Sequence, residues 1–543
     1  MGCSPVNNKN LNLRTYILDI KGSPIARQSI CKRNRKMVIG EENMVLSNNI
    51  KIIVEENMDP FAKYSNMTLI KEGRFSAVYT VVHSVTGKKR VMKIFHKKRI
   101  KDEFTQDDLA NQIEILKNLS HPNIIKLFEV FTYNFNIYMI YEYCAGGNLL
   151  DLLEKDATFS EQKCRNIMFQ VLSAVSYCHA KGIAHHDLCP EHIVLDNIKA
   201  LNTKEDYNAY SLKIINFGSY MLFNQTTAKS LSPRKRRAIS IGYKSISNPY
   251  FAAPETIEGN FDAITEKCDI WSCGVLMYLL LSGELPFKND ITTQSPSHDM
   301  PTKVSFEQLK FRPVDIWDNI STESKDLVKS LLQISPQKRP SATDALKSKF
   351  FTQSDSFVTK SINKKQFNLL LTNMRKYNYK YKLKDAITSF IIHHLMKKED
   401  VDTMRKAFSV FDKNHDGKIS KKELISVMER IMTPIQATKE VNKILANLNK
   451  ENNDEIEYEE FIKTAIDMDK IINERNLKMI FDLIDKDNSG SVTKYELKNF
   501  FLGAYSTDSL MSDDKVFVDL IKEIDVNGDG EITYNEFKKM MLK

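Results

Sequence analysis

Three segments near the carboxyl end of the chain carry oxygen-bearing side chains at the spacing of a calcium-binding loop. Residues 412–423, DKNHDGKISKKE, place such side chains at the first, third, fifth and twelfth loop positions and a glycine at the sixth. The spacing recurs at 485–496 and at 525–536. Calcium takes roughly six to eight oxygen ligands, and the glycine allows the sharp turn that gathers them around one ion. Three copies in register predict three calcium sites.

The predicted calcium ligands occupy equivalent positions in the three loops. They are Asp412, Asn414, Asp416, Lys418, Ser420 and Glu423, then Asp485, Asp487, Ser489, Ser491, Thr493 and Glu496, and finally Asp525, Asn527, Asp529, Glu531, Thr533 and Glu536. A further copy, 449–460, begins with Asn449 and has Asp454 where the glycine should stand. We interpret it as a weakened or metal-free loop, and the whole of 400–543 as a calmodulin-like domain of four EF-hand units.

The composition indicates a soluble protein of two or three domains. The chain has 543 residues, of which 42% are hydrophobic and 27% charged, and this length exceeds what one hydrophobic core supports. Eight cysteines without paired spacing indicate a reducing compartment. The longest strongly apolar stretch, 274–281, is too short to cross a bilayer. We therefore expect a cytoplasmic location, with membrane association only through lipid attached near the amino terminus.

The net charge of +9 is unevenly distributed, because the calcium loops are acidic and the excess of basic residues lies upstream. Basic runs occur at 32–36 and 234–237. Such runs are usually solvated, and we do not expect this chain to bind nucleic acid. The amino-terminal sequence MGCSPV predicts acylation of Gly2 and Cys3, although Val6 stands where the myristoylation motif has Ser or Thr.

The region upstream of the calcium loops divides into three parts by composition. Residues 1–66 are rich in Asn, Lys and Ser, which predicts a flexible extension. Strand signals begin at Thr68, and after about Ser120 the pattern is mainly helical. Residues 352–399 form a basic junction in which one amphipathic helix is expected over 358–398. Its apolar face holds Leu383, Ile387, Phe390, Ile391 and Leu395. Either the calmodulin-like domain grips this helix, or it is an ordinary connecting helix.

Residues 67–351 carry a series of short motifs in a recognisable order. They are VMK ending at Lys93, HPNI from His121, HHDLCPEH from His185, NFG from Asn216, APE ending at Glu255, DIWSCG from Asp269 and the QKRPSA that contains Arg339. In this order they resemble a eukaryotic protein kinase domain. Together with the calcium loops, the chain resembles the calcium-dependent protein kinase family of plants and protists. The fold class implied is α+β: a bilobal kinase-like domain followed by an all-α calmodulin-like domain.

The resemblance assigns roles to individual residues. Glu255 would pair with Arg339, and Asp269 would anchor the catalytic loop, in which Asp187 is the candidate base. The implied ATP-binding positions are Ile70, Gly73, Val78, Lys93, Glu142 and Cys144. By resemblance, the calcium-loaded domain would capture the junction helix and pull it from the kinase-like domain.

Several positions depart from the pattern of an active kinase. They are Lys71 and Ser76 in the glycine-rich loop, Gln112 at the partner position of Lys93, His186, Cys189 and His192 in the catalytic loop, and Asn216 in place of the DFG aspartate. Magnesium prefers hard oxygen ligands, and an amide with an imidazole supplies less charge and a softer donor. Binding of Mg²⁺ or Mn²⁺ is therefore doubtful, whereas ATP can still bind.

Three functions are compatible with this pattern. The chain is a pseudokinase or feeble kinase that acts as a calcium-dependent signalling scaffold, an active serine/threonine kinase with unusual metal requirements, or a calcium buffer with an inert domain. The basic run at 234–237 lies in a long activation segment, where Ser230, Ser232 and Ser240 are candidate modification sites if the insertion has a role. The partner or substrate is not identified by the sequence.

Overall fold

The computed structural model of the chain describes residues 53–56, 59–73, 76–96, 112–113, 115–116, 119–196, 211–217, 221–222, 248–258, 264–287, 309–352, 364–377, 382–448, 455–502 and 514–542. The sequence predictions for Gly2, Cys3, both basic runs and the three candidate serines lie outside these residues.

A six-stranded sheet forms the amino-terminal lobe, in the order β1-β5-β6-β4-β3-β2. Strand β1 pairs with β5 in parallel, and every other pairing in the sheet is antiparallel. Several strands are rich in β-branched and aromatic residues, as in SAVYTVVH of β3, which suits a pleated surface. Their bounds are β1 (Ile53–Glu56), β2 (Tyr64–Glu72), β3 (Ser76–His83), β4 (Lys89–His96), β5 (Leu127–Tyr133) and β6 (Asn136–Glu142).

The sheet differs from the sequence prediction in two places. Strand β1 and the start of β2 lie within 1–66, the region predicted to be a flexible extension. Strands β5 and β6 lie after Ser120, where a mainly helical pattern was predicted, and this prediction is wrong for them. Both strands are apolar along nearly their whole length, LFEVFTY and NIYMIYE, so the period-two alternation that marks a strand is hidden.

The carboxyl-terminal lobe is built around two long buried helices, α4 (Glu161–Ala180) and α8 (Lys267–Ser282). Helix α8 lies close to α10 because Gly274 has no side chain, and a Cβ there would come within 2.9 Å of the Cβ of Leu331. The other elements of this lobe are α3 (Leu149–Lys155), β7 (Ile183–Ala184), β8 (Ile193–Leu195), β9 (Leu212–Ile214), β10 (Met221–Leu222), α7 (Pro254–Ile257), α9 (Val314–Trp317), α10 (Thr322–Leu331), α11 (Ala342–Leu346) and α12 (Lys349–Thr352).

The junction contains two helices, α13 (Lys364–Lys376) and α14 (Lys382–Leu395), so the prediction of one helix over 358–398 is wrong in its extent. The predicted apolar face of α14 is nevertheless buried. Leu383, Ile387 and Ile391 belong to one hydrophobic cluster with the calmodulin-like domain, and Phe390 and Leu395 lie partly buried against it. Lys463 of that domain also forms an ion pair with Asp385 of α14, with 3.1 Å between Nζ and Oδ2.

The calmodulin-like domain consists of two pairs of helix-loop-helix units. A short antiparallel ladder joins the two loops of each pair, β11 with β12 and β13 with β14. The elements are α15 (Lys398–Phe411), β11 (Lys418–Ser420), α16 (Lys421–Met428), α17 (Pro434–Asn447), β12 (Glu455–Glu457), α18 (Tyr458–Ala465), α19 (Met468–Ile471), α20 (Glu474–Ile484), β13 (Ser491–Val492), α21 (Lys494–Leu502), α22 (Asp514–Lys522), β14 (Ile532–Thr533) and α23 (Tyr534–Leu542).

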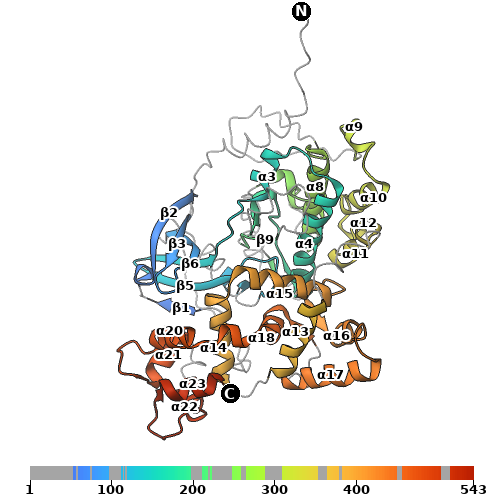
Figure 1. The fold of residues 1–543 in the computed structure, drawn as a ribbon. Helices are drawn as coiled ribbons and strands as arrows, with labels where there is room; N and C mark the ends of the chain where they lie inside the picture. Colours follow the sequence, from blue (N-terminus) through green and yellow to red (C-terminus); the bar gives the residue numbers. More distant parts are fainter. Residues whose placement is uncertain are drawn as a thin grey trace, which may run out of the picture.

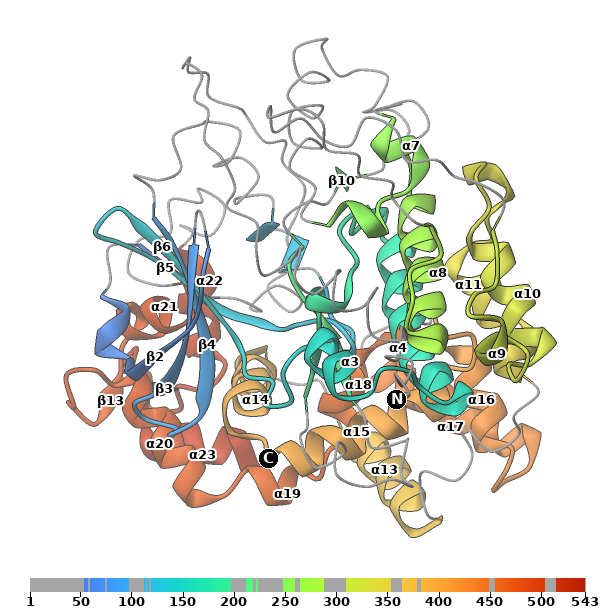
Figure 2. The same cartoon turned by 90° about the horizontal axis from the view of Figure 1, so that it is seen from above.

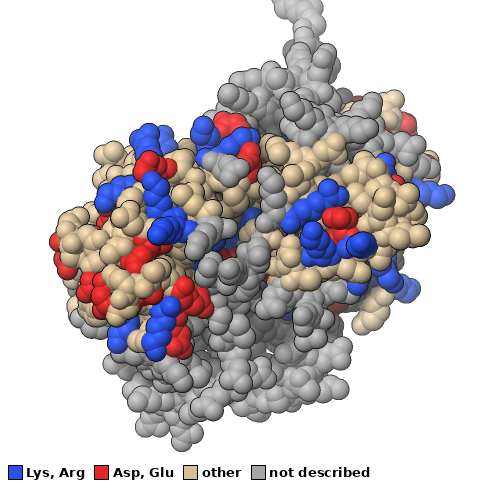
Figure 3. All heavy atoms as spheres, turned by 60° about the horizontal axis from the view of Figure 1, so that its bottom comes forward, with Lys and Arg blue, Asp and Glu red and all other residues tan. Residues whose placement is uncertain are grey.

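The calmodulin-like domain lies along one side of both lobes of the kinase-like domain (Figures 1 and 2), and its helix α21 contacts β1 of the sheet directly. On the face drawn in Figure 3, basic and acidic side chains are interspersed over the described surface. None of the described helices combines the length and apolarity needed to span a membrane. All six described cysteines are free thiols.

Candidate calcium sites and nucleotide cleft

The glutamate at the twelfth position of each of the three calcium loops reaches back over the start of its own loop. In the first loop, Glu423 Oε1 accepts hydrogen bonds from the main-chain nitrogen atoms of Lys413 at 2.9 Å and Asn414 at 3.0 Å. Glu496 and Glu536 accept equivalent bonds of 2.9 Å from the second residues of their loops. The predicted bidentate ligand therefore faces the loop interior in all three copies.

The glycine at the sixth position is held by the first aspartate of the same loop. The main-chain nitrogen of Gly417 donates to Asp412 Oδ2 at 3.0 Å, and Gly490 and Gly530 donate to Asp485 and Asp525 at 3.0 and 2.8 Å. The φ angles of the three glycines are 82°, 89° and 81°, which a residue with a Cβ adopts only with strain. Glycine is thus required by the conformation of the loop.

The donor set of the first loop fits a divalent cation. Asp412 Oδ1 is buried and has no hydrogen-bond partner among the described residues. Burial, together with the charges of Asp416 and Glu423, raises the pKa of Asp412 to about 8. A bound Ca²⁺ would relieve both the desolvation and the repulsion. In the loop 485–496, ligand atoms of Asp485, Asp487 and Glu496 lie within 4.8 Å of one another, which also suits one ion.

The described part of the degenerate loop contacts the kinase-like domain through its acidic residues. Glu457 pairs with Lys181, with 3.0 Å between Oε1 and Nζ, and Glu459 pairs with Lys126, with 3.2 Å between Oε2 and Nζ. The start of this loop, 449–454, lies outside the described residues. Two carboxylates of this unit therefore bind lysines of the neighbouring domain.

The first calcium loop rests on helix α4 of the kinase-like domain. The ring of His415 lies 4.4 Å from that of Phe169, measured between centroids. A Cβ on Gly417 would come within 2.5 Å of Tyr177 Cδ2 and 2.8 Å of His121 Cδ2. Burial lowers the pKa of His415 to about 4, so the imidazole is neutral at pH 7. No sequence signal marks this contact, because His415 stands at a loop position that has no role in binding calcium.

The structural framework of the kinase-like domain has the predicted contacts. Arg339 donates two hydrogen bonds to Glu255, at 2.6 and 2.8 Å. Asp269 accepts main-chain hydrogen bonds of 2.8 Å from both His185 and His186. A hydrogen bond from His179 and the charges of His179, His186 and His185 hold the pKa of the Asp269 carboxyl well below its usual range despite burial. The predicted roles of Glu255, Arg339 and Asp269 are confirmed.

The two positions that hold magnesium in an active kinase are hydrogen-bonded to each other. The amide nitrogen of Asn216 lies 3.0 Å from His192 Nε2 and donates to it, and His192 Nδ1 donates to the main-chain oxygen of Asp187 at 2.7 Å. The oxygen of Asn216 accepts from Lys93 Nζ at 3.3 Å. Each side chain at the predicted metal position thus has a protein partner.

Lys93 lies buried at the predicted ATP-binding position. Burial lowers its pKa to about 8. Gln112, at the position of the usual glutamate, is buried, and among the described residues no hydrogen bond joins it to Lys93. Among the described residues, Gln112 therefore does not give Lys93 the counter-charge that a glutamate at this position would supply.

The remaining predicted nucleotide positions lie on strands β2 and β3 and at the hinge. Ile70 and Lys71 on β2 are exposed, Val78 on β3 is half-buried, and Gly73 donates a main-chain hydrogen bond of 2.8 Å to Ser76. At the hinge, the side chain of Glu142 forms an ion pair with Lys213, with 2.9 Å between Oε1 and Nζ. Burial and the charge of Glu142 raise the pKa of the Cys144 thiol. In the catalytic loop, burial lowers the pKa of His186, which replaces an arginine that is always charged.

Comparisons with known proteins agree with this geometry. The protein kinase domain family matches residues 64–351, and the EF-hand domain pair matches 401–465 and 474–542. The chain thus combines a protein kinase domain with two EF-hand pairs.

Relatives extend over nearly the whole chain. It is 32% identical over 492 residues to Calcium-dependent protein kinase 4 of Plasmodium berghei (strain Anka), covering 89% of this chain and 86% of the relative. It is 30% identical over 554 residues to Calcium-dependent protein kinase 4 of Plasmodium falciparum (isolate 3D7), covering 99% and 98%. It is also 30% identical to Calcium-dependent protein kinase 5 of Plasmodium falciparum, covering 99% and 83%. The chain belongs to the calcium-dependent protein kinase family.

Proposed function

We propose that this chain is a calcium-responsive signalling protein whose kinase domain is a pseudokinase or a very weak kinase. The observation that carries the proposal is the hydrogen bond between Asn216 and His192. Phosphoryl transfer depends on metal ions that neutralise charge on the transferred group. In this cleft an ion would have to break that hydrogen bond and would gain only an amide and an imidazole as ligands.

Calcium would act through the contact between the first calcium loop, 412–423, and the kinase domain. The ion would be ligated by Asp412 and Glu423, in a loop that itself touches Tyr177 and His121 through Gly417. Filling the loop fixes its conformation and therefore the surface that it presents to α4. A calcium buffer would need neither this contact nor the burial of α14 in the EF-hand cluster, so a switch is favoured over a buffer.

The test is transfer of the γ-phosphate of ATP by the purified chain with calcium, in Mg²⁺ and in Mn²⁺. We expect nucleotide binding without appreciable transfer. Transfer that is lost in Asp187→Ala would defeat the proposal. The hydrodynamic radius, measured with and without calcium, separates a switch from a buffer, because a buffer should not change shape.

The alternative is an active serine/threonine kinase with unusual metal requirements. It is favoured by the retained Asp187 and by Asn216 Oδ1, which receives Lys93 at 3.3 Å. An amide keeps the shape and one oxygen of the missing aspartate. Asn216 therefore retains the contact with Lys93 but not the negative charge that an aspartate would bring. Transfer in Mn²⁺ but not in Mg²⁺ would support this alternative.

Partners and location follow from the same proposal. The calmodulin-like domain would bind the junction helices within the chain, and an external protein would be recruited by the calcium-dependent shape. Acylation of both Gly2 and Cys3 would attach the protein to a membrane surface, a single acyl chain would anchor it only marginally, and without acylation the protein would be cytoplasmic. Mass measurement of the intact protein isolated from its own cells tests for the acyl groups.

A further inference from the structure

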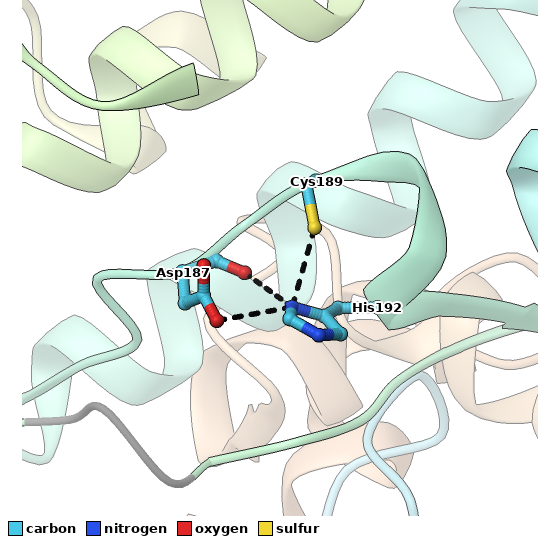
Figure 4. A group of neighbouring side chains, drawn as sticks. All are labelled: Asp187, Cys189 and His192. Carbon is cyan, nitrogen blue, oxygen red and sulfur yellow. Dashed lines mark hydrogen bonds and ion pairs between the residues drawn. The ribbon is translucent and has the colours of Figure 1, made fainter. Parts of the chain in front are cut away.

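Three side chains of the catalytic loop direct potential metal ligands at one point. Cys189 Sγ lies 3.3 Å from His192 Nδ1, and His192 Nδ1 lies 3.4 Å from Asp187 Oδ2 (Figure 4). All three ligand atoms lie within 4.8 Å of one another. Asp187 and Cys189 are buried, whereas His192 is partly open. Cys189 and His192 are both departures from the kinase pattern, and each of them introduces a donor suited to a softer metal.

Two of the three spacings in this group are close to the edges of a tetrahedral zinc site, and the third, between Cys189 Sγ and the Asp187 carboxylate, is at most 4.8 Å. Zinc lies about 2.3 Å from thiolate sulfur and about 2.0 to 2.2 Å from imidazole nitrogen and carboxylate oxygen. Two such ligands of a tetrahedron are then about 3.4 to 3.6 Å apart. The observed distances of 3.3 and 3.4 Å reach these values with small side-chain movements. On binding, the Cys189 thiol would release its proton to solvent, and the resulting thiolate together with the Asp187 carboxylate would neutralise the charge of a divalent ion.

The neighbours of His192 allow a metal ion to replace the proton on its Nδ1. In the described arrangement Nδ1 carries a proton that it donates to Asp187 O at 2.7 Å, and Nε2 accepts from the Asn216 amide. An ion would replace the Nδ1 proton, and the ring proton would move to Nε2. Asn216 could then turn its amide and accept that proton with its oxygen, as outer partners of metal-bound histidines do. The exchange costs the 3.3 Å contact between Lys93 and Asn216 Oδ1.

We propose that Asp187, Cys189 and His192 form a site for a thiophilic divalent ion of the zinc class, with the fourth position left to water or a ligand in the cleft. The site is distinct from the calcium loops, and it shares His192 with the magnesium positions while its other ligands come from Asp187 and Cys189. It would engage the carboxylate of Asp187, which could not then act as a base. The proposal does not depend on whether the chain transfers phosphate.

The test uses cobalt as a spectroscopic probe of the full chain, with excess calcium present to fill the EF-hand loops. Tetrahedral Co²⁺ with a thiolate ligand gives intense visible bands and a sulfur-to-cobalt charge-transfer band in the near ultraviolet. We expect one equivalent of Co²⁺ to produce both bands and Zn²⁺ to remove them. His192→Asn and Cys189→Ser should each weaken Co²⁺ binding by at least about tenfold, since even changes of outer partners cost that much.

The control is Cys144→Ser, which removes a partly exposed thiol at the hinge and should leave both bands unchanged. Calcium titration of each variant shows that the EF-hand domain is intact. Far-ultraviolet circular dichroism and the thermal transition show whether the kinase domain is folded. Absence of the charge-transfer band in the folded wild-type protein would overturn the proposal. Its persistence in Cys189→Ser would overturn it equally, because the thiolate would then belong to another site.

Discussion

The calcium loops and the nucleotide cleft treat divalent ions in opposite ways. In the first loop, three carboxylates converge and Asp412 Oδ1 is buried without a hydrogen-bond partner among the described residues. In the cleft, His192 and Asn216 are hydrogen-bonded to each other at 3.0 Å, and the charged groups beside them are Lys93 and Asp187. A buried polar atom without a partner is costly, and a cation removes that cost. Ligands that already hold hydrogen bonds gain much less from an ion.

The largest expected effect is the loss of a calcium ion from a loop whose twelfth residue is neutralised. Glu423→Gln and Glu536→Gln should each weaken binding at their own loop on the order of 100-fold, equivalent to about 2.8 kcal/mol. The amide retains the shape but supplies neither the charge nor two equivalent oxygens. Calorimetric titration measures the number of ions bound.

Glu460→Gln is the matched control in the degenerate loop. It should leave the number of bound ions unchanged. A wild-type titration that fits four equally strong sites, or loss of an ion in Glu460→Gln, would show that the loop 449–460 binds calcium after all.

The second prediction concerns restoring a carboxylate at the magnesium position of the cleft. The double variant His192→Asn with Asn216→Asp should raise the affinity for Mg²⁺-ATP by about tenfold or more. The added carboxylate supplies charge both to the ion and to Lys93, and a unit charge at about 4 Å is worth roughly 4 kcal/mol at an effective dielectric near 20. Titration of nucleotide with and without Mg²⁺ measures the gain.

Asn319→Asp adds the same charge far from the cleft and should have no such effect. If the double variant binds ATP no better in Mg²⁺ than the wild type does, the hydrogen bond between His192 and Asn216 is not what limits metal binding.

The third prediction separates the calcium loop from its contact with α4. Gly417→Ala and Gly490→Ala place a Cβ at nearly the same positive φ, 82° and 89°, which costs about 1 to 2 kcal/mol. Only the Cβ at position 417 meets buried atoms, those of Tyr177 and His121, whereas position 490 faces open space. Gly417→Ala should therefore also increase hydrogen exchange in α4. Equal exchange in the two variants would mean that the loop does not rest on α4 in solution.

The smallest expected effect is a pH dependence of nucleotide binding. Burial lowers the pKa of Lys93 to about 8, so the amine is charged below that pH and loses its charge as the pH rises through it. Metal-free ATP binding should weaken by about three- to tenfold between pH 7.5 and 9.5. Lys93→Met should bind more weakly at all pH values and show no such slope. A slope that survives this substitution would assign the titration to another group.

The calcium loops could be predicted from the sequence because their ligands lie within twelve residues of one another. Asp412, Gly417 and Glu423 need only local geometry to meet. The hydrogen bond between His192 and Asn216 joins residues 24 apart, and nothing in either residue's neighbours reveals it. The contact of His415 with Phe169 joins two domains, so it depends on their docking, which single-sequence patterns do not contain.

The errors in the fold have a similar origin. Strands β5 and β6 are apolar along most of their length, so their periodicity gives no clear signal. The junction was predicted as one helix because its apolar residues keep a helical period, but the period says nothing of where the chain is interrupted. The burial of Leu383, Ile387 and Ile391 was anticipated, because a helical stripe predicts which side is covered even when it does not identify the covering surface.

The position of Gly417 against Tyr177 has a consequence for how a signal could travel. Tyr177 lies in the last turn of α4, and only a turn and strand β7 separate that helix from His185, where the catalytic loop begins. The part of α4 that faces Gly417 is thus close along the backbone to the start of the catalytic loop. Binding of an ion in the first calcium loop would therefore alter the surroundings of the catalytic loop without any large rearrangement between the lobes.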